Sequence, residues 1–207
     1  MKTIAAAFLC LAFSLPAIAQ MAEMPSAKNF SAGDTWTWVQ TDGRTKLEDA
    51  RITRTAVETD AGLRFRQGGT NAISNYFIGI PGQKQPWRLW PLQIGKTWTY
   101  EEDWKDGAAT GTFLQKVTVV AYEEVTVPAG KFMAFRIEHR GWNGGVGASG
   151  YAFNTAQTDI YWYAPAVMAD VRRTSVSQFR NWIRELASYK LAQPGTVAET
   201  PPAVARP

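Results

Sequence analysis

The sequence predicts an all-β fold, a single curled antiparallel sheet of about ten strands that forms a barrel or a sandwich. Three observations predict it. The 207 residues include nine Trp, seven Tyr and ten Phe, side chains that favour pleated, half-buried strand surfaces. The clearest segments alternate apolar and polar residues with a period of two, as strands with one buried face do. A short motif also occurs twice, which predicts two related meanders.

The longest alternating run predicts a hairpin. Val117, Val119, Ala121, Val125 and Val127 share one parity, and the residues Pro128-Ala129-Gly130 supply a turn. Met133 to His139 then alternate as the second strand. The remaining predicted strands are Thr35 to Gln40, Ala50 to Glu58, Leu63 to Arg66, Asn75 to Ile80, Thr97 to Trp104, Thr158 to Tyr163, Val171 to Val176 and Glu185 to Leu191. An alternative for Trp182 to Tyr189 is one helix.

The repeated motif is Gly33-Asp34-Thr35-Trp36-Thr37-Trp38, which recurs as Gly95-Lys96-Thr97-Trp98-Thr99-Tyr100. Two copies indicate duplication inside one domain, because a solenoid needs three or more stacked units.

The first residues predict an export signal at 1–19 that forms a helix. Lys2 provides the positive start, Ile4 to Leu15 an apolar run, and Ala17-Ile18-Ala19 a cleavage site. The run is shorter than the roughly 20 residues that cross a bilayer, so we expect no stable membrane span once the signal is removed. Cleavage would also remove Cys10, the only cysteine. The expected location is periplasmic or secreted.

The rest of the chain divides by composition into three parts. We expect a flexible leader at 20–29, a β-rich domain at 30–192 and a disordered tail, rich in Pro and Ala, at 193–207.

Charge and motifs argue against several function classes. The net charge is +4 and the bases are interspersed with acids, so a nucleic-acid partner is not expected. One His and one Cys are too few for a usual zinc site, and we expect no cofactor. His139 follows the apolar parity of its strand, which favours a packed histidine over a catalytic one.

Two other motifs have ordinary structural explanations. Residues 145–150 read G-x-G-x-x-G, but a strand rather than a helix is expected to follow, which favours a loop over a dinucleotide site. The acids at 101–103 and 123–124 are adjacent, and neighbours on a strand point to opposite faces. An enzyme is therefore not expected, with a carboxylate-based hydrolase as the weaker alternative.

The segment Pro86-Trp87-Arg88-Leu89-Trp90-Pro91-Leu92 is the most suggestive of a binding site. Two indoles held between prolines could present rigid faces to a sugar ring or an acyl chain, with Arg88 as a polar anchor. They could equally cap the core. The candidate ligand-binding residues are Trp87, Arg88, Trp90, Trp98 and Tyr100.

A family resemblance rests on four groups of residues. They are Trp90-Pro91-Leu92-x-x-Gly95-Lys96-x-Trp98-x-Tyr100, Val125-x-Val127-Pro128-Ala129-Gly130-Lys131-Phe132-x-Ala134-Phe135, Tyr161-Trp162-Tyr163-Ala164-Pro165 and Tyr189-Lys190-Leu191. In these the last half of the chain resembles the TapB-like group of exported bacterial β-rich proteins. The usual Gly after Ala-Pro is replaced here by Ala166. The resemblance implies export and a β-rich fold, and it brings no catalytic residues.

We therefore expect an exported, non-catalytic binding module for an apolar or glycan ligand in the cell envelope. The alternative is an assembly protein that docks an envelope protein through the loop at 141–150 or through an open sheet edge. Its candidate partner-binding residues are Gly145, Val146 and Gly147.

Overall fold

The computed structural model describes residues 21–68, 73–74 and 86–192. This part of the chain is all-β: its only helices are two short 3-10 turns. The elements are β1 (Met21–Ala22), η1 (Ala27–Asn29), β2 (Thr35–Asp42), β3 (Glu48–Val57), β4 (Arg64–Gln67), β5 (Ile73–Ser74), β6 (Leu92–Gln93), β7 (Thr97–Asp106), β8 (Ala109–Val127), β9 (Gly130–Val146), β10 (Ala152–Ala164), η2 (Pro165–Val167), β11 (Ala169–Ser177) and β12 (Asn181–Lys190).

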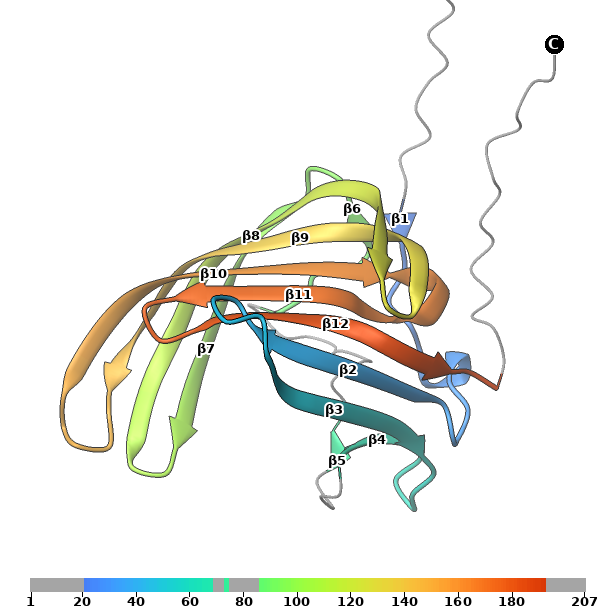
Figure 1. The fold of residues 1–207 in the computed structure, drawn as a ribbon, viewed down its shortest axis with the longest axis horizontal. Coiled ribbons are helices and arrows are strands. Elements are labelled where there is room, and N and C mark those ends of the chain that lie inside the picture. Colours follow the sequence, from blue (N-terminus) through green and yellow to red (C-terminus); the bar gives the residue numbers. More distant parts are fainter. Residues whose placement is uncertain (1–20, 69–72, 75–85, 193–207) are drawn as a thin grey trace, which may run out of the picture.

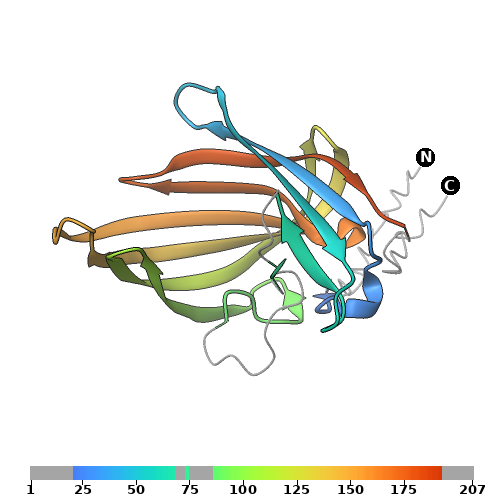
Figure 2. The ribbon, with the colours of Figure 1, turned by 90° about the horizontal axis from the view of Figure 1, so that it is seen from below.

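Ten strands form one antiparallel sheet in the order β5-β4-β3-β2-β12-β11-β10-β9-β8-β7. The chain runs outward through β2 to β5, passes to the far edge, and returns through β7 to β12 until β12 pairs with β2. The sheet curls into an arch whose edges are β5 and β7, so in the described residues it is open rather than a closed barrel (Figures 1 and 2). A small second sheet of β1 and β6 packs on the core of the β7–β10 half, which makes the arrangement sandwich-like.

Most predicted strands are confirmed. The hairpin of β8 and β9 turns at residues 128–129, as the alternation predicted. The predicted strand Asn75 to Ile80 lies outside the described residues, as does the signal helix. The helical alternative for Trp182 to Tyr189 is wrong, because these residues form β12, whose backbone pairs with β11 on one side and β2 on the other.

The repeated motif marks the first strand of each meander. Gly33 and Gly95 have φ of 94° and 86°, and each precedes a strand, β2 or β7. Only glycine adopts such angles without strain, which explains its place in both copies. The aromatic side chains that follow, such as Trp36 and Trp98, contact the core.

The segment expected to be a loose leader is packed onto the domain. Ala22 and Phe30 are buried, and η1 lies between them. Asp34, also buried, accepts hydrogen bonds from the backbone N–H groups of Ser31 and Ala192, each at 2.7 Å. One carboxylate therefore joins the start of the domain to its end.

Two hydrophobic clusters form the core. One lies around Trp36, Phe65 and Leu186, the other around Leu92, Phe135 and Ile137. The first is tied to the β10–β11 connection because the Trp36 indole N–H donates to the carbonyl of Val167 at 2.9 Å. In the part of the chain that is described, no helix has the length and hydropathy needed to span a membrane.

Candidate functional site

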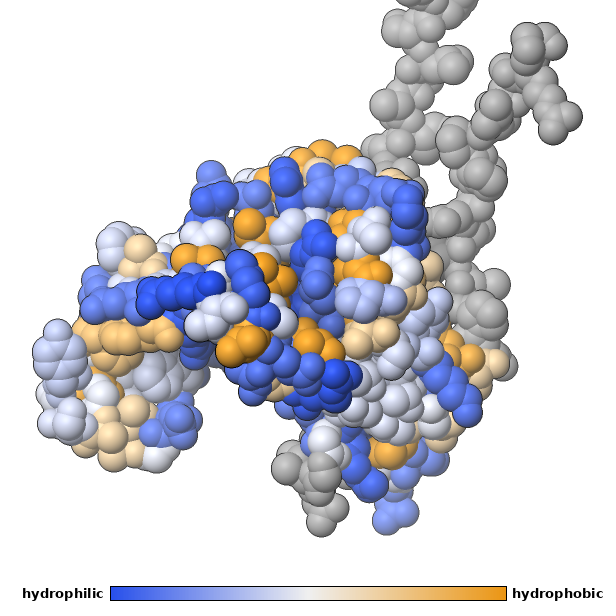
Figure 3. Space-filling view, in the orientation of Figure 1, coloured by the Kyte–Doolittle hydropathy of each residue, from blue (hydrophilic) through white to orange (hydrophobic). Residues whose placement is uncertain are grey.

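The concave face of the arch brings together side chains from β7 to β12. Because strand side chains alternate, residues of one parity on each strand face this side. The space-filling view shows the molecule hollowed beneath the arch, between the projecting ends of β7–β10 and the strands β2–β5 (Figure 3). The candidate site lies on this face.

The four aromatic candidates belong to one hydrophobic cluster, and two of them, Trp87 and Trp90, lie against Arg88. Its guanidinium pairs with Asp170 at 2.8 Å, and the two side chains are only 6% and 19% exposed. The guanidinium carbon also lies 4.2 Å from the ring centroid of Trp87 and 5.0 Å from that of Tyr163. Arg88 is therefore enclosed by aromatic rings and neutralised by a carboxylate.

The four aromatic candidates pack against other side chains of this core cluster. Trp87 and Trp90 contact Tyr161 and Tyr163 edge-on, with ring centroids 5.1 and 5.2 Å apart. The Trp98 indole N–H donates to the carbonyl of Pro86 at 2.8 Å, and the buried Tyr100 hydroxyl bonds to Glu102. These contacts explain the four residues as part of the core. Their role in ligand binding stays a prediction.

A buried polar layer lies beside this cluster. Its members come from three adjacent strands: Gln115 on β8, His139 on β9, and Gln157 and Asp159 on β10. Gln115 Oε1 is 3.3 Å from His139 Nδ1, and Gln157 Nε2 donates to Asp159 Oδ2 at 2.5 Å. Arg173 on β11 pairs with Asp159 at 3.2 Å.

Three atoms of this layer are buried without a hydrogen-bond partner among the described residues: Gln115 Nε2, His139 Nε2 and Gln157 Oε1. A buried polar group left unpaired costs about 1–3 kcal/mol, and such groups at one place are uncommon in folded proteins. These three atoms also have almost no solvent-accessible surface.

The ionisable members of the layer have shifted pKa values. Burial, assisted by the nearby Arg88 guanidinium, lowers the pKa of His139 from 6.5 to about 3. Burial alone would raise the pKa of Asp159, but Arg173 and hydrogen bonds from Gln157 and Ser175 hold it below its usual value. At neutral pH the histidine is thus neutral and the aspartate is charged and paired.

The low pKa of His139 predicts acid sensitivity. In the unfolded chain this histidine takes up a proton as the pH falls through about 6.5, whereas in the folded protein it does so only near 3. The unfolded state then binds more protons, so the free energy of unfolding should be about 2 kcal/mol lower at pH 5 than at pH 7. Asp159 adds a further loss only below its unfolded pKa of 3.8. Urea titrations across this range measure the slope.

The matched control is His139→Gln, which keeps a polar side chain but cannot titrate. Its free energy of unfolding should be nearly constant between pH 7 and pH 5. An equal slope in both proteins would assign the acid sensitivity to other groups.

A run of aromatic rings continues from the polar layer to the ends of the strands. Trp104 on β7 lies 6.3 Å from Phe113 and stacks on Phe153 at 6.1 Å, and Phe153 contacts Phe179 at 5.7 Å. Phe179 is 60% exposed and the other three are half-buried. The Trp104 indole N–H donates to Asn143 Oδ1 at 2.9 Å, which links the run to the sheet.

This aromatic run was not predicted from the sequence. Trp104 has the same parity as Trp98 and Tyr100 on one strand, a signal that could have placed it on the same face. The sequence around Phe153 and Phe179 carries no comparable pattern. These two rings reach Trp104 only through the pairing of strands that are distant in the sequence.

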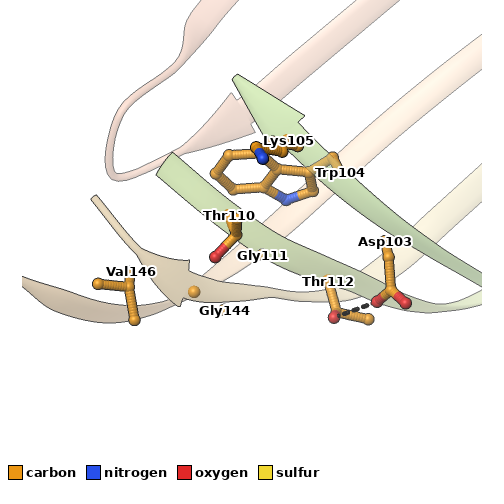
Figure 4. Close-up of a pocket in the computed structure, with 9 residues that line it drawn as sticks. Asp103, Trp104, Lys105, Thr110, Gly111, Thr112, Gly144 and Val146 are labelled. Carbon is orange, nitrogen blue, oxygen red and sulfur yellow. Dashed lines mark hydrogen bonds between the residues drawn. The ribbon is translucent and has the colours of Figure 1, made fainter. Parts of the chain in front are cut away.

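A hollow of about 510 Å³ lies beside Trp104 at the ends of β7, β8 and β9 (Figure 4). Its size is typical of small-molecule sites. Three of its lining residues, Trp104, Gly111 and Gly145, have the parity of the concave face. The other six have the opposite parity, so the hollow opens mainly on the other face of the sheet: Asp103, Lys105, Thr110, Thr112, Gly144 and Val146. Two candidate partner-binding residues, Gly145 and Val146, are thus in its wall, and Gly147 follows at the start of the turn.

The other motifs are placed as structural features. The loop expected at 141–150 is wrong for residues 141–146, which belong to β9 and pair with β8 and β10. Only residues 147–151 form a turn, and strand β10 rather than a helix follows, which argues against a dinucleotide site. Asp103 accepts a hydrogen bond from Thr112 at 2.6 Å, and Glu123 accepts one from the Trp162 indole at 2.8 Å. Within residues 21–68, 73–74 and 86–192 no group of His, Cys, Asp and Glu is arranged to hold a metal ion.

No family model and no curated protein matches the chain, so the resemblance to TapB-like proteins is not confirmed. Among solved structures the chain is similar to a "putative lipoprotein" from Parabacteroides distasonis, with a TM-score of 0.51 and 12% identity over 82% of this chain and 99% of that chain. It is also similar to a "putative exported protein with YmcC-like fold" from Bacteroides fragilis, with a TM-score of 0.42 and 11% identity over 78% of this chain and 97% of that chain. At this identity the first likeness shows a shared fold.

Proposed function

We propose that the protein is an exported, non-catalytic binding protein of the cell envelope that holds a ligand against the concave face of its sheet. The observation that carries this proposal is the incompletely buried aromatic run of Phe113, Trp104, Phe153 and Phe179 on this face. Flat rings bury a large apolar area at little cost in conformational entropy, which suits both sugar rings and acyl chains.

Export is supported by the signal pattern at 1–19. The fold likeness to the Parabacteroides distasonis protein, whose name describes it as a lipoprotein, is in line with a place outside the cytoplasm.

A test replaces Trp104, the ring at the centre of the run, by alanine. We would measure binding calorimetrically with two kinds of probe: laurate, and the tetrasaccharides cellotetraose, maltotetraose and chitotetraose. Loss of one stacked ring should weaken binding of the recognised probe about tenfold, equivalent to about 1.4 kcal/mol.

The control is Trp142→Ala. Trp142 is 53% exposed and lies on the opposite parity of β9, facing away from the concave side. This change should leave binding unaltered. If no probe binds the folded protein, or if Trp104→Ala and Trp142→Ala behave alike, the proposed site is wrong.

A second candidate function, docking of an envelope protein, is favoured by one observation. Gly145 and Val146 line the hollow, and Val146 and Tyr151 flank the turn with 43% and 71% of their surfaces exposed. A partner recovered from envelope extracts by the wild type, and lost when residues 147–150 are replaced by a two-residue Asn-Gly turn, would support docking.

A further inference from the structure

Strand β7 is a long open edge of the main sheet. It is the last strand in the sheet order and has ten residues (Figures 1 and 2). Among the described residues it pairs with β8 alone, whereas the strand at the opposite edge, β5, has only two residues. Unpaired backbone N–H and C=O groups along such an edge form a template on which a further strand can pair.

The hydrogen-bond ladder shows which backbone groups of β7 point outward. Just before β7, the Val119 N–H donates to the carbonyl of Lys96 at 2.9 Å. Hydrogen-bonded and non-hydrogen-bonded pairs alternate along an antiparallel ladder, so from Lys96 onward the even-numbered residues bond to β8. The odd-numbered residues direct their N–H and C=O groups to the open side: Thr97, Thr99, Glu101, Asp103 and Lys105. No backbone hydrogen bond joins these five residues to another described strand or loop on that side.

The exposed side chains of this edge are mainly acidic. Glu101, Glu102, Asp103 and Asp106 are exposed, and Lys105 is the one base of the strand. None of the ion pairs among the described residues includes a residue of β7. The edge therefore combines a row of outward backbone groups with an excess of negative charge.

The charges argue against a second copy of the chain as the occupant of this edge. Like charges directly opposite each other on paired strands are destabilising. Two β7 edges that pair antiparallel about any residue from 101 to 104 place an acid opposite an acid, such as Glu102 opposite Asp106. The same charges favour a strand of opposite sign, because specificity arises from repulsion of wrong partners as well as attraction of the right one.

We propose that the β7 edge binds an extended, basic segment of another protein, which adds a strand to the sheet beside β7. The segment pairs through its backbone with Glu101, Asp103 and Lys105, and its Lys or Arg side chains lie opposite the acids at 101–103 on both faces of the sheet. The hollow of about 510 Å³ adjoins this position, with Asp103 and Lys105 of β7 in its wall, and leaves room for side chains of the added strand. This docking is independent of ligand binding on the concave face.

The first test uses two peptides of equal charge. One is acetyl-Thr-Val-Lys-Arg-Lys-Val-Thr-amide, and the other has the same sequence with its central backbone nitrogens methylated, so that it cannot pair as a strand. Fluorescence anisotropy with labelled peptides should show binding of the first and binding at least about tenfold weaker of the second. In the complex, amide hydrogen exchange should slow at Asp103 and Lys105, whereas the Trp104 amide, already bonded to β8, should change little.

A second test reverses the charge of the edge. The double variant Glu101→Lys, Asp103→Lys should bind the basic peptide about tenfold more weakly, and should instead bind acetyl-Thr-Val-Glu-Asp-Glu-Val-Thr-amide. The control is Asp49→Lys, Glu58→Lys, which makes the same change in net charge at exposed acids on and just after β3. It should leave the affinity for the basic peptide unchanged.

The comparison of the two equally charged peptides on the wild type needs no variant. If the basic peptide does not bind, or if the methylated peptide binds equally well, the proposal of strand addition is wrong. A dimeric wild-type protein in which the Asp103 and Lys105 amides already exchange slowly would assign the edge to a second copy and would also overturn it.

Discussion

Replacing Arg88 by methionine is expected to lower the free energy of unfolding by about 3–5 kcal/mol, the usual result of removing one partner of a buried ion pair. The change leaves Asp170 without its counter-charge in a position where its side chain is 19% exposed. It also removes the cation that lies over Trp87 and Tyr163. Denaturation in urea at pH 7 measures the effect.

Arg51→Met is the control for this prediction. Arg51 pairs with Glu48 at 2.9 Å, but the two side chains are 56% and 45% exposed. Exposed pairs contribute at most about 1 kcal/mol, so the control should change stability little. If both variants lost the same small amount of stability, the buried pair of Arg88 and Asp170 would not stabilise the fold as expected. The double variant Arg88→Met, Asp170→Leu should recover part of the loss, because no unpaired charge remains.

Gly141→Ala is expected to destabilise the protein by about 3 kcal/mol or more, since the strain cannot be relieved by a side-chain movement. A Cβ at this position would lie 2.1 Å from the carbonyl oxygen of Leu114 and 2.7 Å from the Cα of Gln115. Both are backbone atoms of the paired strand β8. The two strands would have to move apart at this pair, Gly141 and Gln115.

Gly147→Ala serves as the control. Its new Cβ would have its nearest neighbour, the carbonyl oxygen of Tyr151, at 3.6 Å, an ordinary contact. Thermal unfolding of both variants should show a large decrease in Tm for Gly141→Ala and little change for Gly147→Ala. Similar Tm values for the two would mean that the paired strands tolerate a side chain at Gly141.

Part of the candidate site could be predicted from sequence. The close spacing of Trp87, Arg88 and Trp90 indicated a cluster, and the structure brings these residues together around Arg88. The partner of the cation could not be predicted. Asp170 lies 82 residues away along the chain, and only the return of the chain along the concave face brings it to Arg88.

The polar layer was also hidden in the sequence. His139 was expected to pack, and it is buried. Gln115 and Gln157 belong to no recognisable motif, and nothing in the sequence around either one relates it to the other. They become one layer because β8, β9 and β10 pair in a register that puts both of them opposite Gly141. A register shift of one residue would turn either glutamine to the other face.

The sequence by itself determined the strands, because a period of two depends only on which face of each strand is buried. It also determined where the two meanders begin, since Gly33 and Gly95 adopt angles that other residues avoid. Tertiary structure decided that β2 pairs with β12, that the arch stays open, and that the aromatic run and the polar layer share one face. These features depend on strand register and on contacts between residues distant in the chain. The free energies of such contacts cannot be inferred from the local sequence pattern.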